Sequence, residues 1–363
     1  MARIIKISVI VFCIFGYTAV FAKDSTIRVI AYYSGSSEKL DSFPVEKLTH
    51  IIYSFSHLNG NKLDIGNEES IATVKKMVSL KGRNSNLKVI LSLGGWGGCK
   101  TCSAVFSTEE NRRVFAGSVL ILLKKYGADG LDLDWEYPAI EGYPGHEYMP
   151  EDKQNFASLL QILRDTLGNS YEISFAAGGF EKYMEEAIEW EKIAPLINYV
   201  NLMSYDLVHG YSVVTGHHTP LYSTPDQFLS VDWGVKKLIE KGVPKKKIII
   251  GAAFYGRFWE NVSAENNGLY QSGKFLKGES IRNLEKLIST DKHFKYFWDD
   301  TAKAPYLYNK EQKLFVTYDD RTSIELKTQY AIDQKIGGIM FWELSLDYNK
   351  GGLLDVIDRV KRK

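Results

Sequence analysis

The chain has 363 residues, of which 45% are hydrophobic and 25% are charged. This balance is typical of a globular protein that is long enough to bury a large core, in one large domain or two. Its 45 basic and 44 acidic side chains give a formal net charge of +1, which supplies no field to concentrate a polyanion, so nucleic acid is excluded as an expected partner and a neutral ligand is favoured.

The amino-terminal segment has the pattern of a secretory signal peptide. Two basic residues precede an apolar run over 7–22, and Ala22 at its end is followed by the polar Lys23. We predict a signal peptide over residues 1–22 and therefore a secreted protein, extracellular or periplasmic, with no membrane association after cleavage. The alternative is a membrane anchor, but the run is shorter than the roughly 20 apolar residues that a spanning helix needs.

Short apolar runs rich in β-branched residues recur along the chain, and each is followed by a stretch long enough for a helix. Helical periodicity is clearest over 110–126, 152–167, 230–241 and 323–335. Strands that alternate with helices pair in parallel through right-handed crossovers, and eight such units predict an α/β fold, the (β/α)8 TIM barrel. The eight predicted strands cover residues 27–33, 49–56, 87–93, 130–135, 171–177, 199–204, 247–254 and 338–342.

Beyond the predicted signal, the chain has two cysteines, Cys99 and Cys102, in the stretch GGCKTCS. One C-x-x-C pair offers only two metal ligands, and no second Cys or His cluster accompanies it at metal-binding spacing. In an exported chain we therefore predict a local disulfide. A thiol redox centre is the alternative, and we expect no metal and no cofactor.

Four carboxylates lie within eight residues, on the fourth predicted strand and at its two ends: Asp129, Asp132, Asp134 and Glu136. Residues two apart on a strand face the same side, so the last three line up, and the apolar residues between them face the other side. In a parallel barrel the apolar set packs under the helices, and the acids rise through the interior until Glu136 emerges at the mouth. Asp129 has the opposite parity, and we predict a mainly structural role for it.

Such a column of acids can act in general acid catalysis. Like charges a few ångströms apart in a poorly solvated site raise the pKa of at least one carboxyl, so the column would hold a shared proton. We predict that Glu136 is protonated near neutral pH, with Asp132 and Asp134 sharing charge beneath it. Two alternatives stay open, a hard-cation site and a solvated acidic strand, although the missing loop glycines argue against the first and the apolar alternation against the second.

One interval breaks the alternation of strands and helices. Residues 258–317 are rich in aromatic and polar side chains, and their Phe, Tyr and Trp content argues against a disordered linker. We predict a small α+β insertion between strand seven and helix seven, on the face where barrel loops build active sites. The catalytic barrel is then expected over 23–257 and 318–363.

Several short motifs resemble those of one known family, the family 18 glycoside hydrolases, or chitinases. The run DGLDLDWEYP resembles the family's D-x-x-D-x-D-x-E signature from Asp129 to Glu136. The other motifs resemble the same family in the same order and cover nearly the whole mature chain. They are YSFS, LSLGGW, MSYD, TGHHTPLY, YGRFW and GGIMFWELSLD.

The resemblance implies a substrate and a mechanism. The substrate would be a β-1,4 polymer or oligomer of N-acetylglucosamine, cleaved with retention and with the substrate's own acetamide oxygen as the nucleophile. Glu136 would be the general acid and base, Asp134 would hold the acetamido N–H, and Asp132 would share the proton and charge of Asp134. Tyr205 would donate to the acetyl carbonyl oxygen, and Asp206 would bind nearby hydroxyls.

The resemblance also implies residues that bind the substrate. Trp342, at the end of the last strand, would form a hydrophobic floor, and Trp96 would line the cleft. Both could instead be core aromatics, but the glycines that precede them favour exposure. His217 and His218 invite a metal interpretation, yet the first belongs to a structural loop motif in this family, and we leave both out of the chemistry. The remaining expected substrate-binding residues are Tyr32, Phe55, Tyr137, Met203 and Arg257.

Two other functions remain open. A chitin-binding lectin that kept the barrel and lost catalysis usually has the terminal acid replaced, whereas Glu136 is present here. An endo-β-N-acetylglucosaminidase acting on N-glycans is the second, although the MSYD motif and the insertion look more like the chitin-cleaving branch. We therefore expect a secreted chitinase that acts on chitin or chitooligosaccharides as a monomer. Asn261, in NVS, is a formal glycosylation acceptor.

Overall fold

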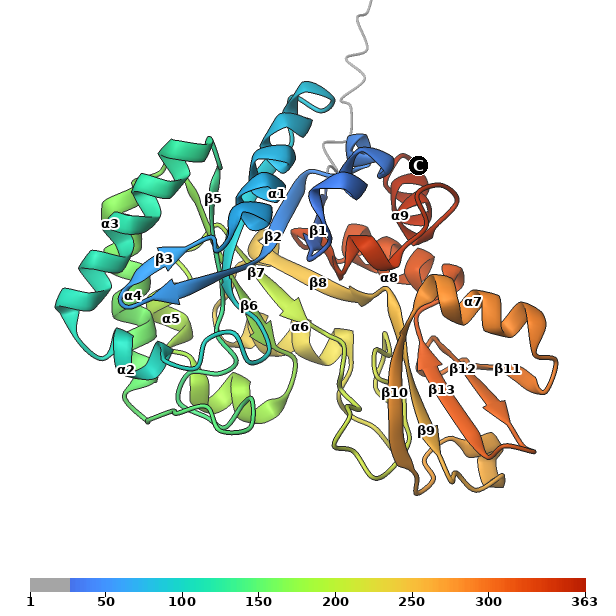
Figure 1. The fold of residues 1–363 in the computed structure, drawn as a ribbon. Coiled ribbons are helices and arrows are strands. Elements are labelled where there is room, and N and C mark those ends of the chain that lie inside the picture. Colours follow the sequence, from blue (N-terminus) through green and yellow to red (C-terminus); the bar gives the residue numbers. More distant parts are fainter. Residues whose placement is uncertain (1–26) are drawn as a thin grey trace, which may run out of the picture.

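Eight parallel strands close into a barrel in the computed structural model, which describes residues 27–363. The first strand pairs with both the second and the last, so the barrel is closed, and the short β3 (Lys62–Asp64) adds a ninth strand that pairs antiparallel with the end of β2. Each barrel strand corresponds to one predicted run, which confirms the (β/α)8 architecture (Figure 1). The predicted signal peptide over 1–22 lies outside the described residues. In barrel order the strands are β1 (Arg28–Tyr33), β2 (His50–Asn59), β4 (Lys88–Gly94), β5 (Gly130–Asp134), β6 (Glu172–Gly178), β7 (Tyr199–Met203), β8 (Ile248–Ala253) and β14 (Gly338–Trp342).

Helices cover the outside of the barrel. The helix α3 (Glu109–Tyr126) begins after Thr108, whose hydroxyl accepts a hydrogen bond from the N–H of Asn111, and it ends at Gly127 in the left-handed conformation. All four helical segments predicted from periodicity end within two residues of a helix end. No helix within the described residues is long and apolar enough to cross a membrane. The other barrel helices are α1 (Glu68–Ser79), α2 (Cys102–Phe106), α4 (Asp152–Leu167), α5 (Trp190–Ile193), α6 (Val231–Glu240), α8 (Arg321–Asp333) and α9 (Leu353–Lys361).

Alternation along the strands sorts the buried side chains into two layers. On β5, Leu131 and Leu133 belong to the outer layer that packs under the helices, as does Trp135 just beyond the strand. The ring of Trp135 lies 5.7 Å from that of Phe106 on α2 and 6.2 Å from that of Phe156 on α4. Removing this layer from water stabilises the closed barrel and turns the acids of β5 inward. The apolar cluster in the barrel interior consists of Ile30, Tyr32, Ile52, Ile90, Tyr199, Ile249 and Met340.

Between β8 and α8 the chain forms a second, antiparallel sheet with one helix, α7 (Ile281–Thr290), which lies beside the barrel in Figure 1. The expected α+β insertion is therefore present, and its sheet extends slightly beyond the predicted range of 258–317. Because its first strand follows directly after β8, the sheet starts at the carboxyl end of the barrel. Its strands are β9 (Tyr255–Glu260), β10 (Lys274–Ser280), β11 (Phe294–Asp299), β12 (Ala304–Asn309) and β13 (Leu314–Tyr318).

Candidate active site

The carboxyl ends of the barrel strands bring the predicted site residues to one place. The acids come from β5 and the two residues after it, whereas Tyr205 and Asp206 follow β7 and Trp342 ends β14. Met203 packs against the interior cluster together with Tyr205 and Trp342. Direct contacts connect the rest of the set, which comprises Tyr32, Phe55, Trp96, Tyr137 and Arg257.

Asp132, at the bottom of the column, is fully buried and accepts four hydrogen bonds. Ser174 and Asn201 donate to its Oδ1 at 2.6 and 3.1 Å. Ser92 and Tyr32 donate to its Oδ2 at 2.8 and 3.1 Å. Burial raises the pKa of Asp132, and these four hydrogen bonds only partly offset the increase. The four donors therefore hold the carboxyl of Asp132 in one orientation, although it is removed from water.

Three of these donors were not among the predicted site residues. Ser92 and Ser174 stand beside Asp132 in the register of β4, β5 and β6, and Asn201 reaches it from β7. Each is a polar residue in an otherwise apolar run, and this signal could have identified them. The signal does not say which carboxylate they serve, because that depends on the strand register.

Asp134 lies between Asp132 and Glu136 on the inward face. Burial raises its pKa well above the ordinary value, and the charges of Glu136 and Asp132 raise it further. Its Oδ1 accepts no hydrogen bond from any residue that the structure describes. Asp134 can therefore hold the proton of the column, and it has an oxygen free to accept a hydrogen bond from a ligand N–H.

Glu136, at the mouth, has a pKa suited to acid and base chemistry. Only 8% of Glu136 is exposed, and this burial is the main cause that raises its pKa to about 7. A hydrogen bond with Tyr137 lowers the pKa, and the negative charge of Asp206 raises it. A carboxyl with this pKa is both protonated and ionised in useful amounts at neutral pH. It can donate a proton in one step and accept one in the next.

Asp206 is held in the ionised state by two neighbours. Arg257 of β9 donates to both of its carboxylate oxygens, with Nη2 2.5 Å from Oδ2, and the Nδ1 of His218 lies 3.4 Å from Oδ1. Burial raises the pKa of Asp206, but these hydrogen bonds and the charge of Arg257 outweigh it and lower the pKa below its usual range. His218 thus contacts the site, which was not predicted. The Nε2 of His217 instead lies 3.0 Å from a carboxylate oxygen of Asp299 in the insertion.

Tyr205 presents a neutral hydroxyl to the site. Its ring packs on Gly251 of β8 so closely that a Cβ there would lie 2.8 Å from Cε1. The hydroxyl oxygen lies 3.9 Å from the sulfur of Met340. Burial and the nearby charges of Asp134 and Asp206 raise the pKa of Tyr205 well above the ordinary value. The hydroxyl therefore keeps its proton and can donate it in a hydrogen bond.

Aromatic rings line the mouth beside the acids. Trp342 stacks on Phe55 with ring centroids 5.6 Å apart and an interplanar angle of 15°, and Tyr32 lies 5.8 Å from it. Gly95, with φ +82°, allows this arrangement, because a Cβ there would lie 2.4 Å from the ring of Phe55. Trp342, Phe55 and Tyr32 together form an apolar floor for a ring-shaped ligand.

Trp96 extends this aromatic surface outward on the loop after β4. Its exposed fraction is 48%, and its ring meets those of Tyr143 at 5.6 Å and Tyr137 at 6.4 Å. Tyr143 was not predicted. Further along the same loop, Cys99 and Cys102 form a buried disulfide, with Cα atoms 5.3 Å apart, as expected from the sequence.

Asp129 lies outside the column. Its Oδ2 accepts a hydrogen bond from the N–H of Val89 at 2.7 Å, and its carboxylate pairs with Lys81 at 2.7 Å and Lys88 at 3.7 Å. These contacts secure the start of β5 against β4. They agree with the structural role expected from its parity.

Within residues 27–363, no group of three or more His, Cys, Asp or Glu side chains is arranged to hold a metal ion.

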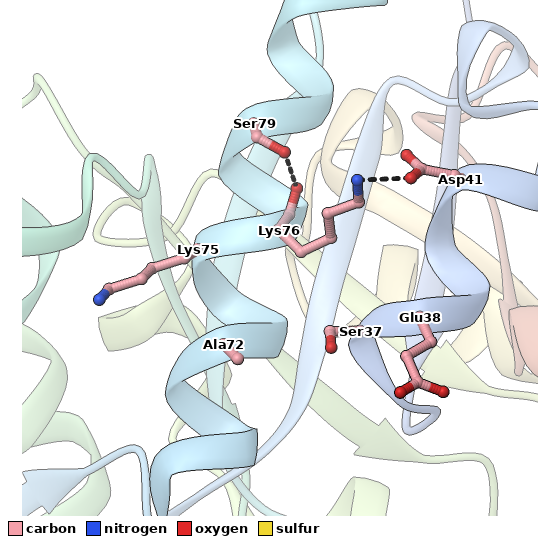
Figure 2. A pocket seen from close by; sticks show the side chains of 7 residues that line it. All are labelled: Ser37, Glu38, Asp41, Ala72, Lys75, Lys76 and Ser79. Carbon is pink, nitrogen blue, oxygen red and sulfur yellow. Dashed lines mark hydrogen bonds and ion pairs between the residues drawn. The ribbon is translucent and has the colours of Figure 1, made fainter.

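A hollow lies on the outside of the barrel, between α1 and the short helix over Ser37–Ser42. Its volume is about 530 Å³, and it contains none of the predicted site residues. Figure 2 shows Lys76 crossing it to Asp41, with an N–O distance of 2.5 Å, while Lys75 points away. Because both partners of this ion pair are exposed to water, it contributes little energy and offers no preorganised chemistry. We assign no site to this hollow.

Glycoside hydrolases are one class of enzyme that places proton-exchanging carboxyl groups beside aromatic side chains at the carboxyl-terminal mouth of a (β/α)8 barrel. The chain belongs to the glycosyl hydrolases of family 18, whose model matches residues 28–347. This match spans the barrel and the insertion together.

Individual relatives agree with this assignment. The chain is 36% identical over 311 residues to Chitinase A1 of Niallia circulans, covering 79% of this chain but only 44% of that protein. It is 29% identical over 403 residues to Chitinase B of Serratia marcescens, covering 90% and 80%. A solved family 18 N-acetylglucosaminidase from Paenibacillus barengoltzii superposes with a TM-score of 0.83 at 34% identity, covering 92% of this chain and 100% of that one.

Proposed function

We propose that this glycoside hydrolase is a secreted chitinase that cleaves β-1,4 linkages between N-acetylglucosamine units with retention. The observation that carries the proposal is the acid column, in which Glu136, with a pKa of about 7, stands above the protonatable Asp134. The named chitinases among the relatives support the choice of substrate.

The chemistry proceeds in two displacements at the anomeric carbon. In the first, Glu136 gives its proton to the glycosidic oxygen as the C–O bond breaks, and the acetamide oxygen of the substrate forms a bond to the anomeric carbon from the opposite face. In the second, the ionised Glu136 takes a proton from water, and the water oxygen displaces the acetamide oxygen. Two inversions leave the configuration retained.

Asp134 and Asp132 stabilise the positive charge that develops in the first displacement. The acetamido N–H can donate to Asp134, whose free Oδ1 faces no competing donor among the described residues. As the positive oxazolinium ion forms, ionisation of Asp134 stabilises it, and Asp132 accepts a share of the released proton. Tyr205, neutral at working pH, donates to the acetyl carbonyl oxygen and directs it toward the anomeric carbon.

The surrounding residues hold the sugar. Asp206, ionised beside Arg257, accepts hydrogen bonds from sugar hydroxyls. Trp342 and Phe55 lie under the sugar ring, and Trp96 continues the aromatic surface for a longer oligomer. Binding energy from these remote contacts can be used to distort the reacting sugar.

Secretion and a monomeric state belong to the same proposal. The pattern over 1–22 supports export to an extracellular or periplasmic space. Amino-terminal sequencing of the exported protein would give Lys23 as the first residue, and recovery of the uncut chain would contradict the proposed cleavage. Light scattering of the mature chain would give the mass of one copy.

The direct test uses a chromogenic chitobioside. Wild type should release the chromophore, and Glu136→Gln should lower kcat by about 1,000-fold, because general acid–base catalysis contributes roughly 10²–10⁴-fold. Glu172→Gln, at the opposite end of the barrel where Glu172 pairs with His50 at 2.9 Å, is the matched control and should retain activity. Equal activity in wild type and Glu136→Gln, or none in either, would refute the proposal.

Three outcomes would favour a different function. Binding of chitooligosaccharide without turnover would favour a lectin, and release of N-glycans from a glycoprotein would favour an endo-β-N-acetylglucosaminidase. The Paenibacillus N-acetylglucosaminidase raises a third outcome, in which only single sugars are released from one end. A time course of products from a chitin hexamer distinguishes this outcome from internal cleavage.

A further inference from the structure

A buried ion pair lies behind the site, between the insertion and the barrel. Lys327 on α8 and Asp319, which follows β13, have side chains that are 0% exposed. The ammonium group of Lys327 donates to both carboxylate oxygens of Asp319 at 2.7 Å and to the hydroxyl of Thr219 at 2.6 Å. Three acceptors satisfy its three donors, so the charge is fully compensated.

The same carboxylate holds three parts of the fold together. Its Oδ2 accepts a hydrogen bond from the N–H of Ala253, at the end of β8, at 3.0 Å. Its Oδ1 accepts one from the hydroxyl of Ser323, in the first turn of α8, at 2.7 Å. Asp319 therefore connects the last strand of the insertion, the following helix and the barrel strand on which the ring of Tyr205 rests.

Thr219 connects the Lys327–Asp319 pair to the backbone at the catalytic mouth. Its hydroxyl donates to the carbonyl oxygen of Ser204 at 2.9 Å, and this carbonyl belongs to the peptide that joins Ser204 to Tyr205. The side chain of Ser204 brackets Gly251, donating to its carbonyl at 3.0 Å and accepting from its N–H at 2.9 Å. The backbone that enters Tyr205 is thus fixed from two sides, by Thr219 and by Gly251.

We propose that Thr219, held by the Lys327–Asp319 pair, is a positioning residue that orients Tyr205 toward the acetamide of the substrate. This inference rests on the proposed function, because it assigns Tyr205 its role there. A buried ion pair contributes little stability compared with a hydrophobic replacement, and its use here is to hold a unique geometry. The insertion, whose last strand leads into Asp319, thereby helps to set the position of Tyr205 in the barrel.

The test is Thr219→Val, which keeps the shape of the side chain and removes the hydroxyl. It should lower kcat on the chromogenic chitobioside by about ten-fold with KM nearly unchanged, because small displacements of a catalytic group are costly to the chemical step. Thr219→Ser, which restores the hydroxyl, should recover the activity. The matched control is Thr328→Val, since Thr328 is equally buried and its hydroxyl donates to the carbonyl of Ile324 on the same α8 at 2.7 Å.

A double-mutant cycle with Tyr205→Phe separates positioning from general loosening. If Thr219 acts through Tyr205, Thr219→Val should cause little further loss of kcat in the Tyr205→Phe background. A full additional ten-fold loss there, or equal losses in Thr219→Val and Thr328→Val, would overturn the inference while leaving an active wild type. An inactive wild type would instead refute the proposed function, and with it this inference.

Discussion

The pH dependence of hydrolysis follows from the protonation of Glu136. The group must be protonated to start the reaction, and its pKa in the free protein is about 7. We therefore predict that kcat/KM falls as pH rises through about 7, and that at pH 9, two units above, only about 1% of the protein carries the proton and kcat/KM is about 100-fold below its plateau. The assay is release of chromophore from the chitobioside at low substrate concentration between pH 4 and 10.

Asp206→Asn tests the physical cause of this pKa. The negative charge of Asp206 raises the pKa of Glu136, so its removal should move the alkaline limb of kcat/KM to lower pH. Asp129→Asn, at the start of β5 and paired with Lys81 and Lys88, should leave the limb in place. A profile that stays flat from pH 6 to 9, or an alkaline shift in Asp206→Asn, would refute the electrostatic reasoning.

Three further predictions concern the walls of the site. Arg257→Met removes two charge-assisted hydrogen bonds to Asp206 and should lower the free energy of unfolding by about 2 kcal/mol at pH 6. Because the pKa of Asp206 is lowered in the folded protein, the difference in unfolding free energy between wild type and variant should shrink as pH falls below about 4. Urea unfolding at pH 6 and pH 3 measures this difference, and a constant value would contradict the prediction. Trp342→Ala removes the aromatic floor and should lower kcat/KM by about 30-fold, equivalent to about 2 kcal/mol of lost burial, whereas Trp233→Ala on α6 should not. Cys99→Ser opens a disulfide that spans three positions in sequence and should cost about 2 kcal/mol of stability with hydrolysis of the dimer retained, while loss of activity without loss of stability would favour a redox role.

Local periodicity was sufficient to predict the acid column. The spacing of Asp132, Asp134 and Glu136 places them on one side of a strand, and the apolar residues between them bury the other side under α2 and α4. The eight strands and the insertion could be predicted for the same reason, since each is marked by its own composition. Such features depend only on residues that are close in sequence.

Features that depend on pairing between distant strands could not be predicted in this way. Ser174 stands beside Asp132 in the register of β5 and β6, and Asn201 reaches Asp132 from β7, one strand further away. The contact of His218 with Asp206 joins two residues that are twelve positions apart in the chain after β7, and no periodic pattern marks it. The Lys327–Asp319 pair is eight residues apart in sequence, but its use becomes visible only when Thr219 is placed against it.

The measurement that tests the central claim most directly is proton NMR of a chitin hexamer during digestion by the mature protein. Substrate-assisted catalysis with Glu136 as acid and base predicts that new reducing ends appear first as the β anomer and convert to the α anomer only by slow mutarotation. Products that appear first as the α anomer, or a hexamer left intact, would contradict it.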